Sequence, residues 1–351
     1  MPLTDLLSQL HTVDDVTDHY DLIEQAAAEG RAGELYDLVV ALRSAGPGWQ
    51  RDAVLDQAQR ALLLTPGEAN AAHAVRLAAA ERSRARLRSA AGQLAAAQPV
   101  DHLLPLYGRH KQALEFFACL TQELVLRHPD IGQADQVRQA ADHLALVGHP
   151  LAALPLGLLG VEEELDLPSY GLRGAAVELP FGPSGQRGTR RRPSGRLPVD
   201  ELPVPEQLTA AVDNWVSDSN GRLEARVFRL RAPIGLDARL LDGLGLACLT
   251  GKGEIHVHAA TPSQVMRVLF AAASTGSAYG SGRGGAYGRL LAWRSMIALA
   301  GATDIEEVAD RTWALFDAST EWFHQVAWDV GVAALDPARL MVSVLAATDE
   351  D

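Results

Sequence analysis

The chain has 351 residues, which is long enough for two ordinary domains, each with its own core. Its 48% hydrophobic and 21% charged residues exclude a disordered chain and are typical of globular proteins. The net charge of -13 argues against general nucleic-acid binding, since neutralising phosphates needs a basic surface. Two cysteines, far apart in the sequence, cannot form a disulfide framework, which favours a reducing compartment.

Nothing in the sequence indicates export or a membrane. The first residues show neither a basic stretch nor a long apolar run, so no secretory signal is expected. The most apolar stretch, 144–161, is interrupted by Gly148 and by two prolines. It falls short of the roughly 20 apolar residues that a membrane span requires. We therefore expect a cytoplasmic protein, and the excess of arginine over the two lysines suggests a bacterial genome rich in GC.

Helical spacing of apolar residues dominates the first half of the chain. Val16, Tyr20 and Ile23 predict a first helix, and further helices follow at similar intervals. We expect a long Ala/Arg-rich helix that runs toward Gln98. The remaining helices of this half are predicted at 112–127, 133–147 and 151–165.

Paired helices with short turns indicate a helix-hairpin array or a bundle. The stretch with Ala58, Ala61, Leu62 and Pro66 resembles the end of a tetratricopeptide-repeat helix. The likeness covers one repeat at most, and no 34-residue period recurs. An irregular bundle is therefore favoured over a true solenoid.

The segment 182–198, GPSGQRGTRRRPSGRLP, is the clearest boundary, because Gly, Pro and Ser prevent regular structure. We place a helical domain at 1–181, a linker at 182–204 and a second domain at 205–351. The arginines of 187–196 could form a basic arm for RNA, DNA or an acidic partner. A solvated loop is the favoured interpretation, and nucleic-acid binding is not expected.

The last part of the chain mixes both periodicities and predicts a smaller α+β domain with antiparallel strands. Thr261, Pro262 and Gln264 form a strong helix start with a capping box. Further helices are expected at 205–217, 286–299 and 303–316. Strands are expected at 224–230, 254–258, 322–332 and 340–345, with the last two forming an antiparallel pair.

The segment 277–289, SAYGSGRGGAYGR, is the most unusual in the chain. Glycine amides before a helix start, together with arginines, are suited to a phosphate, a carboxylate or a nucleotide. A structural loop, in which glycines permit close helix packing, is the slightly favoured alternative. The candidate ligand-binding residues are Tyr279, Gly282, Arg283, Gly285, Tyr287, Arg289, Arg294 and Asp329.

Known catalytic and cofactor motifs are weak or missing. Gly280, Gly282 and Gly285 formally match a dinucleotide fingerprint, but helical periodicity precedes them where a strand is required. The sequence contains no Walker lysine motif, no Gly-x-Ser-x-Gly elbow and no His-Glu-x-x-His. It identifies no cofactor, and Cys119 on an apolar helical face is expected to be an inert thiol.

Glu254, His256 and His258 alternate along a predicted strand and would share one face of it. Two imidazoles so placed can bind a metal, with the glutamate as a third ligand. A further ligand would have to come from a distant part of the chain. Solvated or hydrogen-bonded histidines are therefore favoured.

The segments GGAYGRLLAWRSMIALAG at 284–301 and FHQVAWDVGVAAL at 323–335 are the most distinctive of the last third. In them the chain resembles an uncharacterised actinobacterial family of unknown function. The resemblance implies a bacterial cytosolic setting, and no catalytic residue can be carried over from it.

Two functions remain from the sequence. The first is a non-enzymatic interaction or scaffold protein whose helical half presents a groove to a protein partner. The alternative is an anion- or nucleotide-binding protein, with or without catalysis, that uses the segment 277–294.

Overall fold

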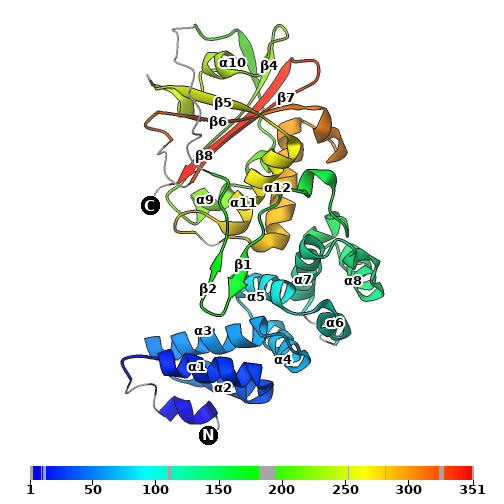
Figure 1. Ribbon diagram of the computed structural model, residues 1–351. Helices are drawn as coiled ribbons and strands as arrows, with labels where there is room; N and C mark the ends of the chain where they lie inside the picture. Colours follow the sequence, from blue (N-terminus) through cyan, green and yellow to red (C-terminus); the bar gives the residue numbers. More distant parts are fainter. Residues whose placement is uncertain are drawn as a thin grey trace. The chain divides into compact units, whose positions relative to one another are not determined.

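The computed structural model describes residues 3–8, 10, 13–109, 113–181, 195–251, 253–280, 282–323 and 328–349 (Figure 1). The chain forms two compact units, and it passes between them three times. Unit 1 comprises Met1–Gly157 and Pro168–Val177, and unit 2 comprises Leu158–Leu167 and Glu178–Asp351. The segment Leu158–Leu167, assigned to the helical half from the sequence, thus belongs to unit 2. The Arg-rich stretch 182–194 lies outside the described residues.

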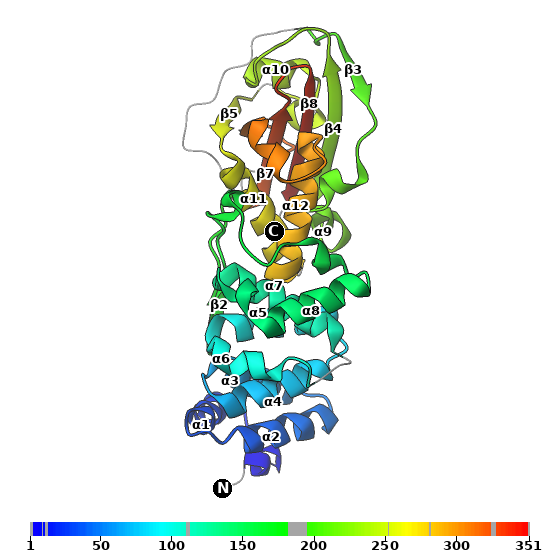
Figure 2. The same ribbon diagram turned by 90° about the vertical axis from the view of Figure 1, so that its right-hand side faces the viewer.

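Helices build unit 1, because apolar residues recur on one face of each. In α2, for example, Leu35, Leu38, Val39 and Leu42 are all fully buried. Successive helices from α1 to α5 contact one another, α5 packs on α7, and α7 contacts α8 (Figure 2). The helices are α1 (Thr17–Ala28), α2 (Ala32–Ser44), α3 (Trp49–Leu64), α4 (Glu68–Ala79), α5 (Arg84–Ala97), α6 (Val100–Leu103), α7 (Leu114–Arg127) and α8 (Asp135–Leu146).

Two helix predictions for this half of the chain are wrong. The long Ala/Arg-rich helix is in fact two helices, since α4 ends at Ala79 and Ser83 caps α5 by accepting the Arg86 amide at 3.4 Å. The stretch 151–165 contains only 3₁₀ turns, at Pro150–Ala153 and Gly160–Glu162. Prolines and glycines in that stretch interrupt the hydrogen bonds that an α-helix needs.

A short hairpin completes unit 1, formed after the chain has returned from unit 2 at Pro168. It consists of β1 (Ser169–Gly171) and β2 (Gly174–Ala176), paired antiparallel. Arg173 in its turn reaches Asp21 at 2.7 Å and Glu24 at 2.9 Å on α1. This hairpin is not predictable from the sequence, because its three-residue strands are too short to show a period.

A six-stranded antiparallel sheet is the centre of unit 2, which confirms the α+β class. The order is β3-β4-β8-β7-β6-β5. The predicted pairing of the last two strands is confirmed, with Val332 opposite Leu345. The strands are β3 (Val199–Leu202), β4 (Arg222–Leu230), β5 (Ile255–Ala260), β6 (Thr312–Ala318), β7 (Trp328–Leu335) and β8 (Met341–Asp349).

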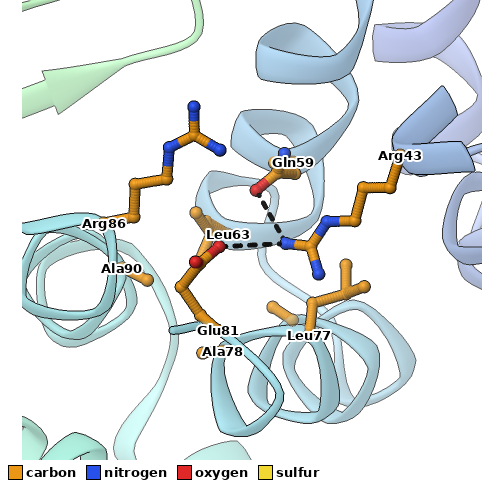
Figure 3. A pocket seen from close by; sticks show the side chains of 9 residues that line it. Arg43, Gln59, Leu63, Leu77, Ala78, Glu81, Arg86 and Ala90 are labelled. Atoms are coloured by element: carbon orange, nitrogen blue, oxygen red, sulfur yellow. Dashed lines mark hydrogen bonds and ion pairs between the residues drawn. The ribbon is translucent and has the colours of Figure 1, made fainter. Parts of the chain in front are cut away.

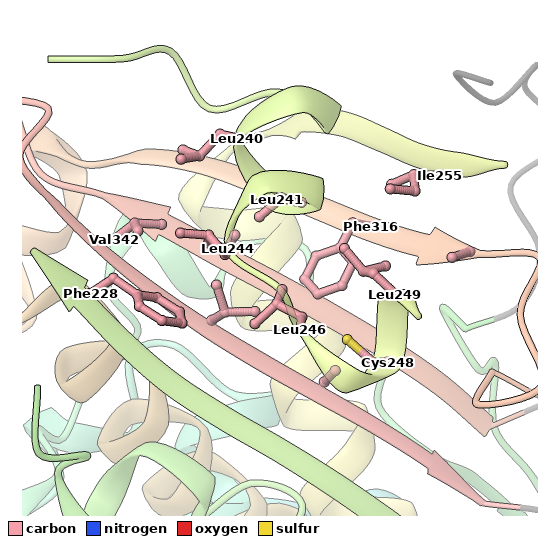
Figure 4. Close-up of a cluster of buried hydrophobic side chains, with 14 of the residues drawn as sticks. Phe228, Leu240, Leu241, Leu244, Leu246, Cys248, Leu249, Ile255, Phe316 and Val342 are labelled. Carbon is pink, nitrogen blue, oxygen red and sulfur yellow. The ribbon is translucent and has the colours of Figure 1, made fainter. Parts of the chain in front are cut away.

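Both faces of this sheet are covered. On one face, α10 (Ala238–Gly243) and the turn Ala247–Leu249 close a core with Phe228, Phe316 and Val342 (Figure 4). Side chains alternate along a strand, so Leu345, also buried, faces the opposite side. There α11 (Pro262–Thr275) contacts β6, and α12 (Gly284–Ala300) contacts β7 and β8.

Of the helices predicted in unit 2 from local sequence patterns, one is confirmed with its capping box and two differ in the structure. The capping box of α11 is confirmed: Thr261 Oγ1 accepts the Gln264 amide at 3.1 Å, and the reciprocal bond measures 3.0 Å. The helix predicted at 303–316 is wrong, because a 3₁₀ turn at Glu306–Asp310 leads directly into β6. The predicted helix 205–217 is divided into a 3₁₀ turn at Glu206–Thr209 and α9 (Asp213–Ser217).

None of the helices in the described part of the chain combines the length and the apolar content that crossing a bilayer requires.

Candidate functional site

The glycine-rich segment connects α11 to α12 and is pinned at several points. Asp349, at the end of β8, accepts the Ala278 amide at 2.8 Å through Oδ2. Ser277 Oγ accepts the Gly280 amide at 3.0 Å, and the Arg283 amide donates to the Ala273 carbonyl at 2.9 Å. Ser281 lies outside the described residues. Hydrogen bonds to β8 and α11, and one within the segment, therefore fix its path.

Two of its glycines permit a close approach to the end of α11. A Cβ at Gly282 would lie 2.0 Å from the Ser274 carbonyl oxygen, and one at Gly288 would lie 2.6 Å from the Ser274 Cβ. Gly285 is buried in the first turn of α12. The packing role that the sequence suggested for glycines in this segment therefore accounts for Gly282 and Gly288.

Arg289 is fully buried in an ion pair with Glu162, which also has no exposed side-chain surface. Its Nε donates to Glu162 Oε1 at 2.6 Å, and its Nη2 donates to Oε2 at 2.8 Å. Trp293 Nε1 donates to Oε1 at 2.8 Å, and the Leu159 amide donates to Oε2 at 2.9 Å. This bidentate pair fastens Leu158–Leu167 to α12 inside unit 2, so Arg289 does not face an external ligand.

The other candidates of the segment are distributed. Arg283 is about a third exposed and lies 3.2 Å from Asp218, so a carboxylate already balances its charge. Tyr279 is 62% exposed, whereas Tyr287 and Arg294 are half-buried. Tyr279, Gly282, Arg283 and Gly285 therefore share one stretch of chain, with less unbalanced positive charge than the sequence suggests.

Asp329 does not join this group. Its carboxylate accepts a hydrogen bond from Thr348 Oγ1 at 2.6 Å, across the β7–β8 pair. By strand alternation it shares the face of Ala333 and Leu335, which is the face that α10 covers. Arg289 lies on α12, which packs on the opposite face, and it is bound to Glu162.

Three buried polar side chains beside the segment were not predicted from the sequence. Both side-chain polar atoms of Asn214, the hydroxyl of Ser274 and Oδ1 of Asp349 have no hydrogen-bond partner among the described residues. Asn214 lies close to the segment, because a Cβ at Gly280 would be 3.6 Å from its carbonyl oxygen. Each such group costs about 1–3 kcal/mol of stability. No sequence pattern marks them, because their burial depends on contacts between distant elements.

The predicted metal-binding residues lie on the edge strand β5 and just before it. His256 Nδ1 is hydrogen-bonded to Asp317 on β6, and its Nε2 is 4.0 Å from Glu254. His258 Nε2 is buried and has no partner among the described residues. In the ranges that the structure describes, no three His, Cys, Asp or Glu side chains are grouped as a metal site.

Unit 1 contains a groove between α7 and α8, with a volume of about 590 Å³. Tyr107 closes one side: its hydroxyl lies 3.1 Å from Thr121 Oγ1, and its ring centroid is 5.0 Å from that of Phe117. Burial raises the pKa of the Tyr107 phenol, which stays neutral. The lining residues are Tyr107, Gly108, Leu114, Phe117, Ala118, Gln136, Gln139, Ala140, His143 and Leu144.

One stripe of α8 faces this groove. Gln136, Ala140 and Leu144 recur at intervals of four, as residues on one helical face do. One turn past Leu144 the stripe continues in the exposed apolar residue Val147, at 49% exposure, whereas Leu146, at 83%, points to another side of the helix. Among the described residues, the lining contains no Asp, Glu, Lys or Arg. These residues of the groove therefore offer a largely apolar surface.

Cys119 lies on α7, whose residues Phe117 and Ala118 line the groove, but it is fully buried. Burial, and then the nearby Glu115 carboxylate, raise the pKa of its thiol. A thiol held protonated is a poor nucleophile. The geometry thus gives no support to Cys119 as a catalytic residue.

Comparison with known proteins gives one match. A family model described as a family of unknown function (DUF6183) matches residues 17–351. No curated protein and no solved structure matches this chain. The match covers nearly the whole chain, and not only the last third in which the sequence resembled a family without an assigned activity. The protein therefore belongs to the family of unknown function DUF6183.

Proposed function

We propose that this protein is a non-enzymatic interaction protein of a bacterial cytosol, which binds a protein partner in the groove between α7 and α8. The observation that carries the proposal is the groove itself, with its volume of about 590 Å³ and its largely apolar lining. Clefts of roughly 300–1,000 Å³ with aromatic walls and a few polar groups are typical binding sites in proteins.

The occupant that fits this groove best is the apolar face of an amphipathic helix. On the groove side of α8 the exposed apolar residue Val147 lies one helical turn past Leu144, so the apolar strip is longer than a compact small molecule needs. A helix that lies in a groove places side chains at intervals of three and four along just such a strip. Gln136, Gln139 and His143 supply polar groups for its edges.

The alternative of anion binding by the segment 277–294 has weaker support. Its two best-placed guanidinium groups are those of Arg283 and Arg289, which lie beside Asp218 and Glu162 respectively. An anion at this segment would have to compete with those carboxylates.

The test uses two arginine substitutions on the same helix. Ala140→Arg puts a charge into the groove, whereas Ala145→Arg puts the same charge on an exposed part of α8 outside the lining. Tagged wild type and both variants serve as baits in cells that make the protein naturally. We expect one protein to be recovered in stoichiometric amounts with wild type and Ala145→Arg. At least tenfold less of it should be recovered with Ala140→Arg, since burying an unpaired charge costs more than about 1.4 kcal/mol.

Recovery of the same partner with Ala140→Arg would refute the groove as its binding site. Native mass spectrometry of the purified protein supplies a second readout. A bound apolar compound of low mass, present in wild type and missing in Ala140→Arg, would replace the protein partner by a small ligand. Absence of any stoichiometric partner from wild type would refute the proposed function as a whole.

A further inference from the structure

A second, smaller cleft lies in unit 1, away from the residues that line the groove (Figure 3). Its volume is about 30 Å³, which is room for one small polar group. Four polar side chains surround it from different elements: Arg43 of α2, Gln59 of α3, Glu81 after α4 and Arg86 of α5. Leu63 and Leu77 are among the apolar residues that complete the lining.

Arg43 is held loosely in this cleft. Its Nη2 lies 3.4 Å from both Gln59 Oε1 and Glu81 Oε2, whereas the partly exposed Arg31–Glu34 pair measures 2.7 Å. Charge-assisted hydrogen bonds of arginine are about 2.7–2.9 Å long. Nε and Nη1 of Arg43 have no side-chain or backbone partner in the described ranges. Much of its capacity to donate hydrogen bonds is therefore unused.

Glu81 is anchored through its other oxygen. Oε1 accepts the Arg82 amide at 2.8 Å and the Ser83 amide at 2.9 Å, just before α5 begins. The carboxylate thus serves the start of that helix and is only 15% exposed. Its position leaves the long contact to Arg43 as a fixed feature of the cleft.

Arg86 supplies a second guanidinium group. Its side chain extends from α5 toward the Gln59 side of the cleft (Figure 3). No hydrogen bond or ion pair of that guanidinium group is found within the described part of the chain. The Gln59 amide nitrogen likewise has no acceptor there, while its oxygen accepts from Arg43. Donors therefore exceed acceptors around the cleft, and two positive charges stand against one negative charge.

We propose that this cleft binds a carboxylate group between Arg43 and Arg86. A planar carboxylate matches the forked donors of a guanidinium group, and its single negative charge balances the net positive charge of Arg43, Arg86 and Glu81. A phosphate dianion would bring a second charge that nothing balances beside Glu81. The apolar lining around Leu63 and Leu77 suits a short aliphatic stem on the carboxylate. The carboxylate comes either from a small organic acid or from the end of a peptide chain.

The experiment follows the Nε–Hε signals of arginine by NMR in the full-length protein, while propanoate replaces chloride at constant ionic strength. We expect saturable shifts in wild type, with Arg43 and Arg86 moving together. Arg86→Gln should weaken binding at least about tenfold, as loss of a charge-assisted pair does. Arg84→Gln is the matched control, because Arg84 is exposed on the same helix and does not line the cleft.

Further probes test which chemical group the cleft binds and whether it comes from a small acid or from a peptide end. Propanamide should not bind, and phosphate should bind more weakly than propanoate. A tetrapeptide with a free C-terminus that binds at least tenfold more tightly than propanoate, and loses this when amidated, identifies a peptide end. Equal affinities identify a small acid. The proposal is overturned if propanoate gives no saturable shift, if Arg86→Gln binds as wild type does, or if phosphate binds more tightly. None of these outcomes depends on the groove between α7 and α8, which Ala140→Arg tests separately.

Discussion

The Glu162–Arg289 pair of unit 2 and the Arg43–Glu81 pair of unit 1 join the same two types of side chain, and they differ in what surrounds them. Arg289 is fully buried, binds both oxygens of Glu162 at 2.6 and 2.8 Å, and shares that carboxylate with Trp293 and the Leu159 amide. Arg43 is 29% exposed and makes only long contacts through one nitrogen. A carboxylate whose hydrogen bonds are all satisfied holds a fold together, whereas a guanidinium group with unused donors is available to a ligand.

The largest effect is expected where the buried pair is broken. Glu162→Gln leaves the Arg289 charge buried without a counter-charge, and removal of one partner from a buried pair costs about 3–5 kcal/mol. Glu163→Gln, at the exposed neighbouring residue, should change the free energy of unfolding by less than about 0.5 kcal/mol. Urea unfolding followed by tryptophan fluorescence measures both, because Trp49 is the only tryptophan outside unit 2. Equal stability of the two variants would remove the contrast between the two pairs.

A smaller effect is expected from a methyl group on the helix that carries Arg289. In Gly288→Ala the new Cβ would meet the Ser274 Cβ at 2.6 Å and its Cα at 3.0 Å. Overpacking of this kind costs about 1–3 kcal/mol, of which better helix propensity offsets up to about 1 kcal/mol.

The matched control is Gly33→Ala on α2 of unit 1, where a Cβ would meet nothing within 4 Å. There the same change should stabilise the helix by about 0.5–1 kcal/mol. Thermal unfolding of the two variants compares the signs directly. Stabilisation by Gly288→Ala would show that a side chain fits between α12 and Ser274, so that close packing would not explain this glycine.

Local patterns in the sequence were reliable guides where few residues decide the structure. The capping box of Thr261 and Gln264 was predictable because both partners lie within one helical turn. The pairing of β7 with β8 was predictable because Asp336-Pro337 separates two apolar runs. A helix was expected at 303–316 because Thr303 and Glu306 match a capping box, but this local pattern is also compatible with a turn followed by a strand. Pairing of Thr312–Ala318 with both β5 and β7 settles its structure, and these contacts come from distant residues.

Distant contacts also decided which arginines carry unused donors. Glu162 and Arg289 are 127 residues apart, and nothing near Glu162 in the sequence distinguishes it from Glu163 and Glu164. Arg289 therefore looked like a ligand-binding residue. Arg86 lies in an Ala/Arg-rich stretch in which no sequence pattern distinguishes it from its neighbours. Only the packing of α2, α3 and α5 brings it to the cleft of Arg43.

The smallest effect is expected from the Arg43–Glu81 pair. Arg43→Gln and Glu81→Gln, alone and together, form a double-mutant cycle that measures their coupling. Partly exposed ion pairs contribute about 0–1 kcal/mol, and the 3.4 Å separation places this pair at the weak end. Glu81→Gln retains one side-chain oxygen for the Arg82 and Ser83 amides, so the cap of α5 is disturbed as little as possible. A coupling energy above about 3 kcal/mol would make this pair as structural as Glu162 and Arg289, and the contrast between the two pairs would be lost.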